Sequence, residues 1–204
     1  MLLDVDDSQL VLVDYQARLM PVIHENALVL GNAMRLGRLA RLLEVPTWGT
    51  EENPAKLGEN PPELRALCRQ TLVKMHFSAA ADGLVELLRP PVRPQQGGNA
   101  RSLPKHLQKP QQQPQAREGR NTLVLAGCEA HVCLLQTSLD LLDQEFDVWV
   151  VTDACSSQSE RNRDAAFDRL AAAGAELVTT EMVAFEWLRT ADHPLFREAL
   201  GLIK

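Results

Sequence analysis

Short, uninterrupted runs of apolar residues recur along this chain of 204 residues, and they alternate with segments whose apolar residues follow a helical period. Continuous apolar strands are buried on both faces, which is typical of parallel sheets covered by helices on each side. The pattern therefore predicts a three-layer, doubly wound α/β fold of the Rossmann-like kind. The expected strands are residues 10–13, 46–50, 72–73, 123–126, 148–152 and 176–180, and the expected helices are residues 27–44, 62–69, 79–89, 130–144, 161–173, 182–189 and 193–202.

Length and composition are those of one domain. With 45% hydrophobic residues, the chain can build one substantial core, and we expect a single domain over residues 1–204. Its first residues are acidic where a secretory signal needs basic ones, and no apolar run approaches the length of a membrane span. The four cysteines are too scattered to suggest a disulfide framework. We therefore expect a soluble, cytoplasmic protein with reduced thiols.

Residues 89–120 interrupt the alternation of strands and helices. They contain six Pro and seven Gln but almost no large apolar residues, so burial cannot offset the entropy lost on ordering them. They also hold seven Lys or Arg and one Glu, which leaves −12 on the rest of a chain whose net charge is −6. Two interpretations stay open: a solvated insertion or loop held against a neighbouring subunit, and a basic arm that contacts an acidic partner. The acidic body disfavours nucleic-acid binding, unless this stretch alone supplies it.

Three chemically capable side chains lie near strand ends. Asp14 and Lys74 end the first and third strand candidates, and Cys133 lies in the turn after the fourth. In an open α/β sheet, ligands bind beyond the carboxyl ends of strands, where two neighbouring strands send their connections to opposite faces. In the common six-stranded order these neighbours are the first and fourth strands. Each residue alone would more often be structural, but their shared position predicts a site.

The chemistry of these three side chains favours nucleophilic catalysis. A thiol near the first turn of a helix feels the positive end of the backbone dipole, and a nearby ammonium also stabilises thiolate. We therefore expect the pKa of Cys133 to lie below the free value of about 8.5. Asp14 would accept and return a proton, while Lys74 would hold the charges in place. The sequence thus predicts a cysteine hydrolase.

Five segments resemble the isochorismatase-like cysteine hydrolase superfamily, namely residues 12–16, 74–78, 127–133, 151–154 and 163–170. The resemblance implies a six-stranded parallel sheet flanked by helices and a catalytic triad of Asp14, Lys74 and Cys133. It also implies an oxyanion hole made by the backbone N–H groups of Glu129 and Cys133. Members of the superfamily usually have a non-proline cis peptide in this turn, which would correspond to the bond between Cys128 and Glu129.

Departures from the superfamily bear on the substrate. Its nicotinamidases carry a metal site on an Asp-x-His pattern after the second strand, whereas residues 50–54 are Thr-Glu-Glu-Asn-Pro, so no metal or cofactor is expected. Its vinyl ether hydrolases typically lack the cysteine. The chain resembles the small single-domain branch of unassigned substrate, which implies a metal-independent cysteine hydrolase of a small amide or related C–N bond, acting through a thioester-type intermediate. An inactive or redox-sensing scaffold and a vinyl ether hydrolase remain alternatives.

Further residues near the strand ends are candidates for substrate contact, although each could equally be structural: Gln16, Glu51, Phe77 and His131. Cys128 could form a disulfide with Cys133 under oxidation or remain a buried thiol. No Gly-x-Gly-x-x-Gly follows the first strand and no Gly-Lys-Ser/Thr occurs, which disfavours dinucleotide and phosphate-loop proteins. The expected partners are a small-molecule substrate and further copies of the chain in a homo-oligomer, a dimer or larger, with no membrane and no nucleic acid.

Overall fold

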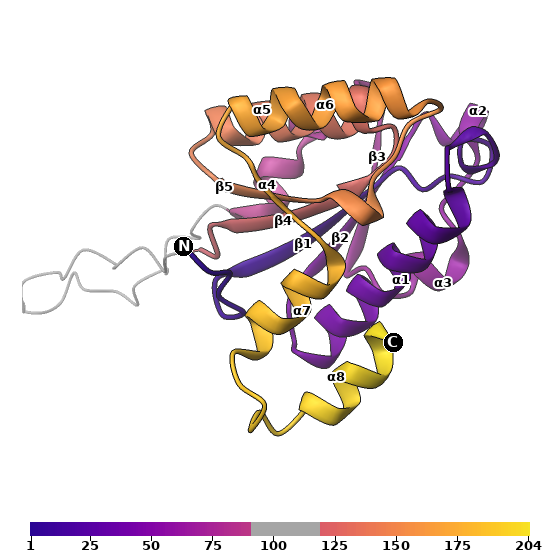
Figure 1. Ribbon diagram of the computed structural model, residues 1–204. Helices are drawn as coiled ribbons and strands as arrows, with labels where there is room; N and C mark the ends of the chain where they lie inside the picture. The colour runs from indigo at the N-terminus through magenta and orange to yellow at the C-terminus, as the bar shows by residue number, and fades with distance from the viewer. Residues whose placement is uncertain (91–118) are drawn as a thin grey trace, which may run out of the picture.

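The computed structural model describes residues 1–90 and 119–204 (Figure 1). The described residues form one parallel sheet in the order β3-β2-β1-β4-β5-β6. Its strands are β1 (Ser8–Val13), β2 (Thr47–Glu52), β3 (Gln70–Lys74), β4 (Thr122–Gly127), β5 (Asp147–Val151) and β6 (Glu176–Val178). Each overlaps its predicted segment, and β1 and β4 are neighbours at the centre. The predicted doubly wound α/β fold is confirmed.

Helices cover both faces of the sheet (Figure 1). One face carries α4 (Leu84–Leu88), α5 (Leu135–Asp143) and α6 (Glu160–Ala172), and the other carries α1 (Asn26–Leu42), α7 (Thr180–Leu188) and α8 (Phe196–Ile203). The short elements are α2 (Pro54–Leu57), α3 (Pro62–Arg65), η1 (Met20–Val22), η2 (Ala79–Asp82), η5 (Ala130–Leu134) and η6 (Thr152–Ala154). Within the described ranges, none of these helices is long and apolar enough to cross a bilayer.

Two of the predicted helices differ from the structure, since one is divided and the other begins with a different helical turn. The segment predicted as a helix over residues 79–89 breaks at Gly83, whose φ of 101° is a left-handed conformation that favours glycine. The helix predicted from residue 130 begins instead with the wider π-helical turn η5, because the N–H of Leu135 donates to the carbonyl of Ala130, five residues back. This turn carries Cys133.

The central strands meet closely at their carboxyl ends. Every residue of β1 and β4 is buried, as the continuous apolar runs predicted. Gly127 ends β4 beside Val13, and a Cβ atom on Gly127 would lie 2.5 Å from both the Cβ and the carbonyl oxygen of Val13. Glycine is therefore required there, and its lack of a side chain lets the two chain segments that leave β1 and β4 lie side by side.

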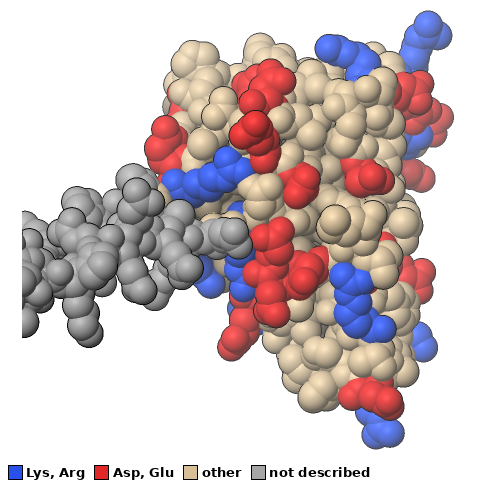
Figure 2. Space-filling model, turned by 90° about the vertical axis from the view of Figure 1, so that its left-hand side faces the viewer, with Lys and Arg blue, Asp and Glu red and all other residues tan. Residues whose placement is uncertain are grey.

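The predicted insertion at residues 89–120 lies outside the described residues except for its two ends. Arg89 places its guanidinium 3.5 Å from the ring centroid of Phe146, and Arg120 donates to the carbonyls of residues 5 and 8. The amide of Gln9 donates to the carbonyls of residues 88 and 120, which ties both ends together. These anchors lie at the amino ends of the strands, the side that Figure 2 shows, where acidic and basic side chains are interspersed with uncharged ones.

Candidate active site

Three strands deliver the three predicted side chains to the same end of the sheet. Asp14 directly follows β1, Lys74 is the last residue of β3, and Cys133 lies in η5 after β4. Asp14 has φ of 53°, a left-handed conformation that Asp tolerates better than most residues, and its N–H donates to the carbonyl of Thr50 on β2. The backbone thus turns out of β1 while staying attached to the sheet.

Asp14 and Lys74 form a buried ion pair. Oδ2 of Asp14 lies 2.7 Å from Nζ of Lys74, and neither side chain is exposed to solvent. Oδ1 of Asp14 accepts a hydrogen bond of 2.7 Å from Oγ1 of Thr50. Nζ of Lys74 also donates to the carbonyls of Phe77 at 3.0 Å and His76 at 3.3 Å. Since buried charges are costly unless paired and hydrogen-bonded, these contacts keep both groups in place.

Cys133 completes the cluster. Its thiol lies close enough to Asp14 and Lys74 for both side chains to act on its ionisation, and the residue is 7% exposed. Oδ2 of Asp14 has no hydrogen bond of good geometry within the described residues, although Nζ of Lys74 lies close to it. This oxygen is therefore available to a proton from the sulfur.

The expectation that Cys133 has a lowered pKa is wrong. The pKa of the thiol is raised from 9.0 to about 12, first by burial and then by the charge of Asp14, and the opposing effect of Lys74 is smaller than either. Because its pKa is raised, the thiol needs a base before it can attack.

Hydrogen bonds to residues 156 and 158 hold the turn before Cys133. The peptide bond between Cys128 and Glu129 is cis, as the resemblance implied. The N–H of Ala130 donates to the carbonyl of Ser156 at 2.7 Å, and Oε2 of Glu129 accepts from the N–H of Gln158 at 3.1 Å. The N–H of Glu129 donates to no group in residues 1–90 or 119–204, which leaves it for a ligand.

Two of the four further candidates are fully occupied with structural contacts. The amide of Gln16 donates to the carbonyls of Glu52 and Gly58 and accepts from the N–H of Glu52, at 2.6 to 2.8 Å. The carboxylate of Glu51 accepts from the N–H of Asn60 at 2.8 Å, and Nε of Arg65 lies 3.5 Å from it. Both residues are buried: Gln16 holds the chain after β1 against the chain after β2, and Glu51 holds the chain after β2 against its own strand.

The other two candidates lie closer to the surface. Phe77 is 51% exposed, and its carbonyl rather than its ring contacts Lys74. Nδ1 of His131 lies 2.9 Å from Oγ of Ser157, and Nε2 lies 3.3 Å from Nδ2 of Asn162. His131 therefore links the turn before Cys133 to the start of α6.

Glu52 was not predicted as a site residue from the sequence, although Glu52 lies beside the cluster. Glu52 pairs in register with Lys74, and it is two residues after Thr50, so all three side chains belong to the same face of the sheet. Burial raises the pKa of the Glu52 carboxyl, the charge of Lys74 lowers it, and that of Asp14 raises it. Side chains along β2 alternate between the two faces of the sheet, and this alternation is the signal that distinguishes Glu52 from Glu51.

The remaining thiols are not paired. All four cysteines are free, and burial raises the pKa of Cys128 and of Cys68 to about 12. Burial likewise raises the pKa of Cys155 well above its ordinary value. Among the described residues, no group of three or more His, Cys, Asp or Glu side chains is placed to hold a metal ion.

Two cavities lie away from the cluster. One of about 380 Å³ lies between α4 and α5 and is lined by Glu86, Asp140 and Asp143 among others. The second, of about 190 Å³, lies at the amino ends of the strands beside Leu3 and Phe146. Neither is lined by Asp14, Lys74 or Cys133, so these two cavities are separate from the cluster.

Comparison with known proteins places this arrangement in a family. The model of the isochorismatase domain matches residues 8–182. The chain belongs to the isochorismatase domain family. Isochorismatase domain-containing protein 2 from Bos taurus is 36% identical over 197 residues, covering 97% of this chain and 83% of that protein.

Solved structures share the fold. A structure described as MAR1 ribonuclease from Caenorhabditis elegans matches with a TM-score of 0.81 and 29% identity, covering 100% of this chain and 92% of that one. YcaC from Pseudomonas aeruginosa, described with hexane-2,5-diol and covalent acrylamide, matches with a TM-score of 0.78 and 26% identity over 98% and 91% of the two chains. YcaC from Escherichia coli, described as an octameric hydrolase of unknown specificity, matches at 0.76 and 26% over 100% and 87%. The chain is an isochorismatase-family hydrolase in fold.

Proposed function

We propose that this protein is a metal-independent cysteine hydrolase that cleaves a small amide or related C–N bond through a thioester-type intermediate. The observation that carries the proposal is that the carboxylate of Asp14 is paired with the ammonium of Lys74 and that both charges act on the thiol of Cys133. A nucleophile, a base and a charge that holds the base are thereby brought together.

In the first half of the reaction, Asp14 takes the proton of Cys133 as the sulfur attacks the carbonyl carbon. The high pKa of the thiol makes this transfer part of the attack, since little thiolate exists beforehand. The N–H groups of Glu129 and Cys133 would hold the negative oxygen of the tetrahedral intermediate. Asp14 then gives its proton to the leaving nitrogen, the C–N bond breaks, and an acyl thioester remains on Cys133.

In the second half, Asp14 takes a proton from a water molecule that attacks the thioester carbon. The tetrahedral intermediate collapses with cleavage of the C–S bond, the carboxylic acid leaves, and Cys133 regains its proton from Asp14. Lys74 stays charged throughout and keeps the carboxylate in position. Gln16 and Glu51 serve in this scheme as positioning residues, because their polar groups hold the loops around the triad.

Two observations on relatives support this chemistry and an oligomeric state. The covalent acrylamide described for YcaC from P. aeruginosa is in keeping with a reactive nucleophile in the family. YcaC from E. coli is described as an octameric hydrolase, and in this chain Val73, Met75 and Phe77 are exposed apolar residues on or just after edge strand β3. We propose a homo-oligomer, a dimer or larger, that acts in the cytoplasm, where its thiols stay reduced.

The deciding experiment is a screen of small amides, ureas and carbamoyl compounds for release of ammonia or amine, with isochorismate included as a vinyl ether. Cys133→Ala is expected to lose turnover, while Cys68→Ala, a change at a partly buried thiol outside the cluster, is expected to retain it. Mass spectrometry of the quenched reaction should show an acylated peptide containing Cys133. Turnover that survives Cys133→Ala, or cleavage of the vinyl ether alone, would contradict the proposal, and absence of any turnover would favour a scaffold.

A further inference from the structure

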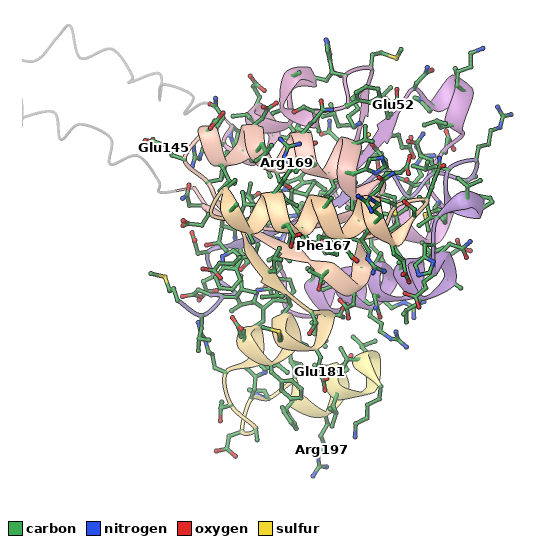
Figure 3. The ribbon with its side chains drawn as sticks, turned by 45° about the horizontal axis from the view of Figure 1, so that its top comes forward. Glu52, Glu145, Phe167, Arg169, Glu181 and Arg197 are labelled. Atoms are coloured by element: carbon green, nitrogen blue, oxygen red, sulfur yellow. The ribbon has the colours of Figure 1, made fainter. Side chains whose placement is uncertain are left out.

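Glu52 is a carboxylate beside the triad that the proposed reaction does not use. It is the last residue of β2 and is half-buried. Its backbone N–H and carbonyl bind Gln16, but its side chain forms no hydrogen bond or ion pair within residues 1–90 and 119–204. Figure 3 labels Glu52 on the part of the molecule that carries the first strands, far from α7 and α8.

The backbone of Glu52 is held in place beside Gln16. The amide of Gln16 donates to the carbonyl of Glu52 and accepts from its N–H, both at 2.8 Å, so the residue is held from both sides. Register pairs Glu52 with Lys74 in the parallel ladder, and side chains of paired residues lie on the same face. Glu52 therefore presents its carboxylate on the face of the sheet end that holds Asp14.

The carboxylate of Glu52 has no ion-pair partner of its own within residues 1–90 and 119–204. The charge of Lys74 lowers the pKa of Glu52, but the ammonium of Lys74 lies 2.7 Å from Asp14, whose charge raises the pKa of Glu52. Lys74 forms its ion pair with Asp14 and none with Glu52. Because a half-buried anion without a partner attracts cations, the site favours a ligand that brings a positive charge.

We propose that Glu52 is a specificity-determining residue that accepts hydrogen bonds from a positively charged nitrogen of the substrate, so that the preferred substrates are small amides bearing an ammonium group. This inference rests on the proposed reaction at Cys133 and deepens it. A cation beside Glu52 also favours the ionised carboxylate, which strengthens the contact. Asp14 is already paired, so Glu52 supplies charge recognition while Asp14 supplies proton transfer.

Turnover of two matched amides tests the charge preference. Glycinamide and propionamide have nearly the same shape, and glycinamide carries an ammonium group where propionamide carries a methyl group. We expect kcat/KM to favour glycinamide, and Glu52→Gln to reduce that preference by about tenfold. The matched control is Glu63→Gln, which removes the same charge from an exposed residue of α3 and should leave the ratio unchanged. An unchanged ratio in Glu52→Gln would overturn the inference.

A second measurement needs no turnover, so it separates this inference from the proposed reaction. The rates at which Cys133 reacts with cationic 2-aminoethyl and anionic 2-sulfonatoethyl methanethiosulfonate are measured by peptide mass spectrometry, with Cys68 as an internal reference. We expect the cation-to-anion ratio at Cys133 to fall about tenfold in Glu52→Gln and to invert in Glu52→Lys. If the ratio at Cys133 stays constant in folded variants, Glu52 does not set the charge preference. If it shifts while no amide is hydrolysed, the proposed reaction fails and the recognition stands.

Discussion

Asp14 and Lys74 come from strands that β2 separates, yet their charged atoms lie 2.7 Å apart and neither side chain reaches solvent. The pair therefore reaches across the end of β2, where Thr50 binds the other oxygen of Asp14. Removal of one partner from a buried pair leaves an uncompensated charge and typically costs about 3 to 5 kcal/mol of stability. Variants of either residue therefore need a stability measurement beside any assay.

Neutralising Asp14 and neutralising Lys74 should change the reactivity of Cys133 in opposite directions. Asp14→Asn removes the anion that raises the pKa of the thiol, so alkylation by iodoacetamide at pH 8 should become faster by about tenfold. Lys74→Met removes the cation that lowers this pKa, so alkylation should become slower. Both variants should lose amide turnover. If alkylation changes in the same direction in both variants, and circular dichroism shows that both are folded, the arrangement of charges is contradicted.

The pH dependence of alkylation distinguishes a resting thiol from a resting thiolate. The folded pKa of Cys133 is raised from 9.0 to about 12, so the thiolate fraction at neutral pH is small and grows with pH. We expect the rate constant for iodoacetamide at Cys133 to rise about tenfold per pH unit between pH 7 and pH 9, as for any group below its pKa. A plateau already at pH 7 would mean that the sulfur is ionised at rest.

Thr50→Val should impair catalysis without disturbing the strand. Valine keeps the shape and the preference for β structure, but Oδ1 of Asp14 loses its hydrogen bond of 2.7 Å. Hydrogen bonds to charged groups contribute about 1.5 to 3 kcal/mol, so kcat should fall by about tenfold or more if the carboxylate loses its orientation. Thr47→Val is the matched control, because the Thr47 hydroxyl binds only the carbonyl of Val45. Equal effects of the two changes would exclude a positioning role for Thr50.

Gly127→Ala should destabilise the protein severely. The added Cβ would lie 2.5 Å from the Cβ and carbonyl oxygen of Val13, and the backbone of β1 cannot yield without losing its ladder with β4. We expect a loss of about 3 kcal/mol or more in the free energy of unfolding by urea denaturation. Gly201→Ala in α8 meets nothing within 4 Å and should instead be neutral or stabilising, as alanine favours helices. A Gly127→Ala protein as stable as Gly201→Ala would disprove the close approach.

Cys128 should make stability fall at alkaline pH. Its pKa is raised from 9.0 to about 12 in the folded state, so unfolding releases a proton above pH 9 and the free energy of unfolding declines from there. The contribution of Cys128 is fully present below pH 9 and is lost as the pH rises toward 12. Cys128→Ala should reduce this decline by about 1 kcal/mol per pH unit in urea titrations at pH 7, 9 and 10. An identical slope in both proteins would show that Cys128 does not contribute.

The convergence of Asp14, Lys74 and Cys133 could be predicted from the sequence because it depends on strand order and strand ends alone. The pKa of Cys133 could not, since it depends on burial and on how close Asp14 lies compared with Lys74. Glu51 rather than Glu52 was predicted to contact substrate, because the sequence does not show on which face of β2 each side chain lies. Register along β2 pairs Glu52 with Lys74, while Glu51 binds Asn60. Proximity in sequence to a strand end does not reveal which way a side chain points.

The anchors at Arg89 and Arg120 have a practical consequence. These anchors hold the chain on either side of residues 91–118 at the amino ends of the strands. Asp14, Lys74 and Cys133 lie at the carboxyl ends. The length of the strands thus separates these anchors from the three side chains. A fluorescent reporter or affinity handle attached at these anchors would lie at the opposite ends of the strands from Cys133, which offers a way to immobilise the molecule away from its thiol.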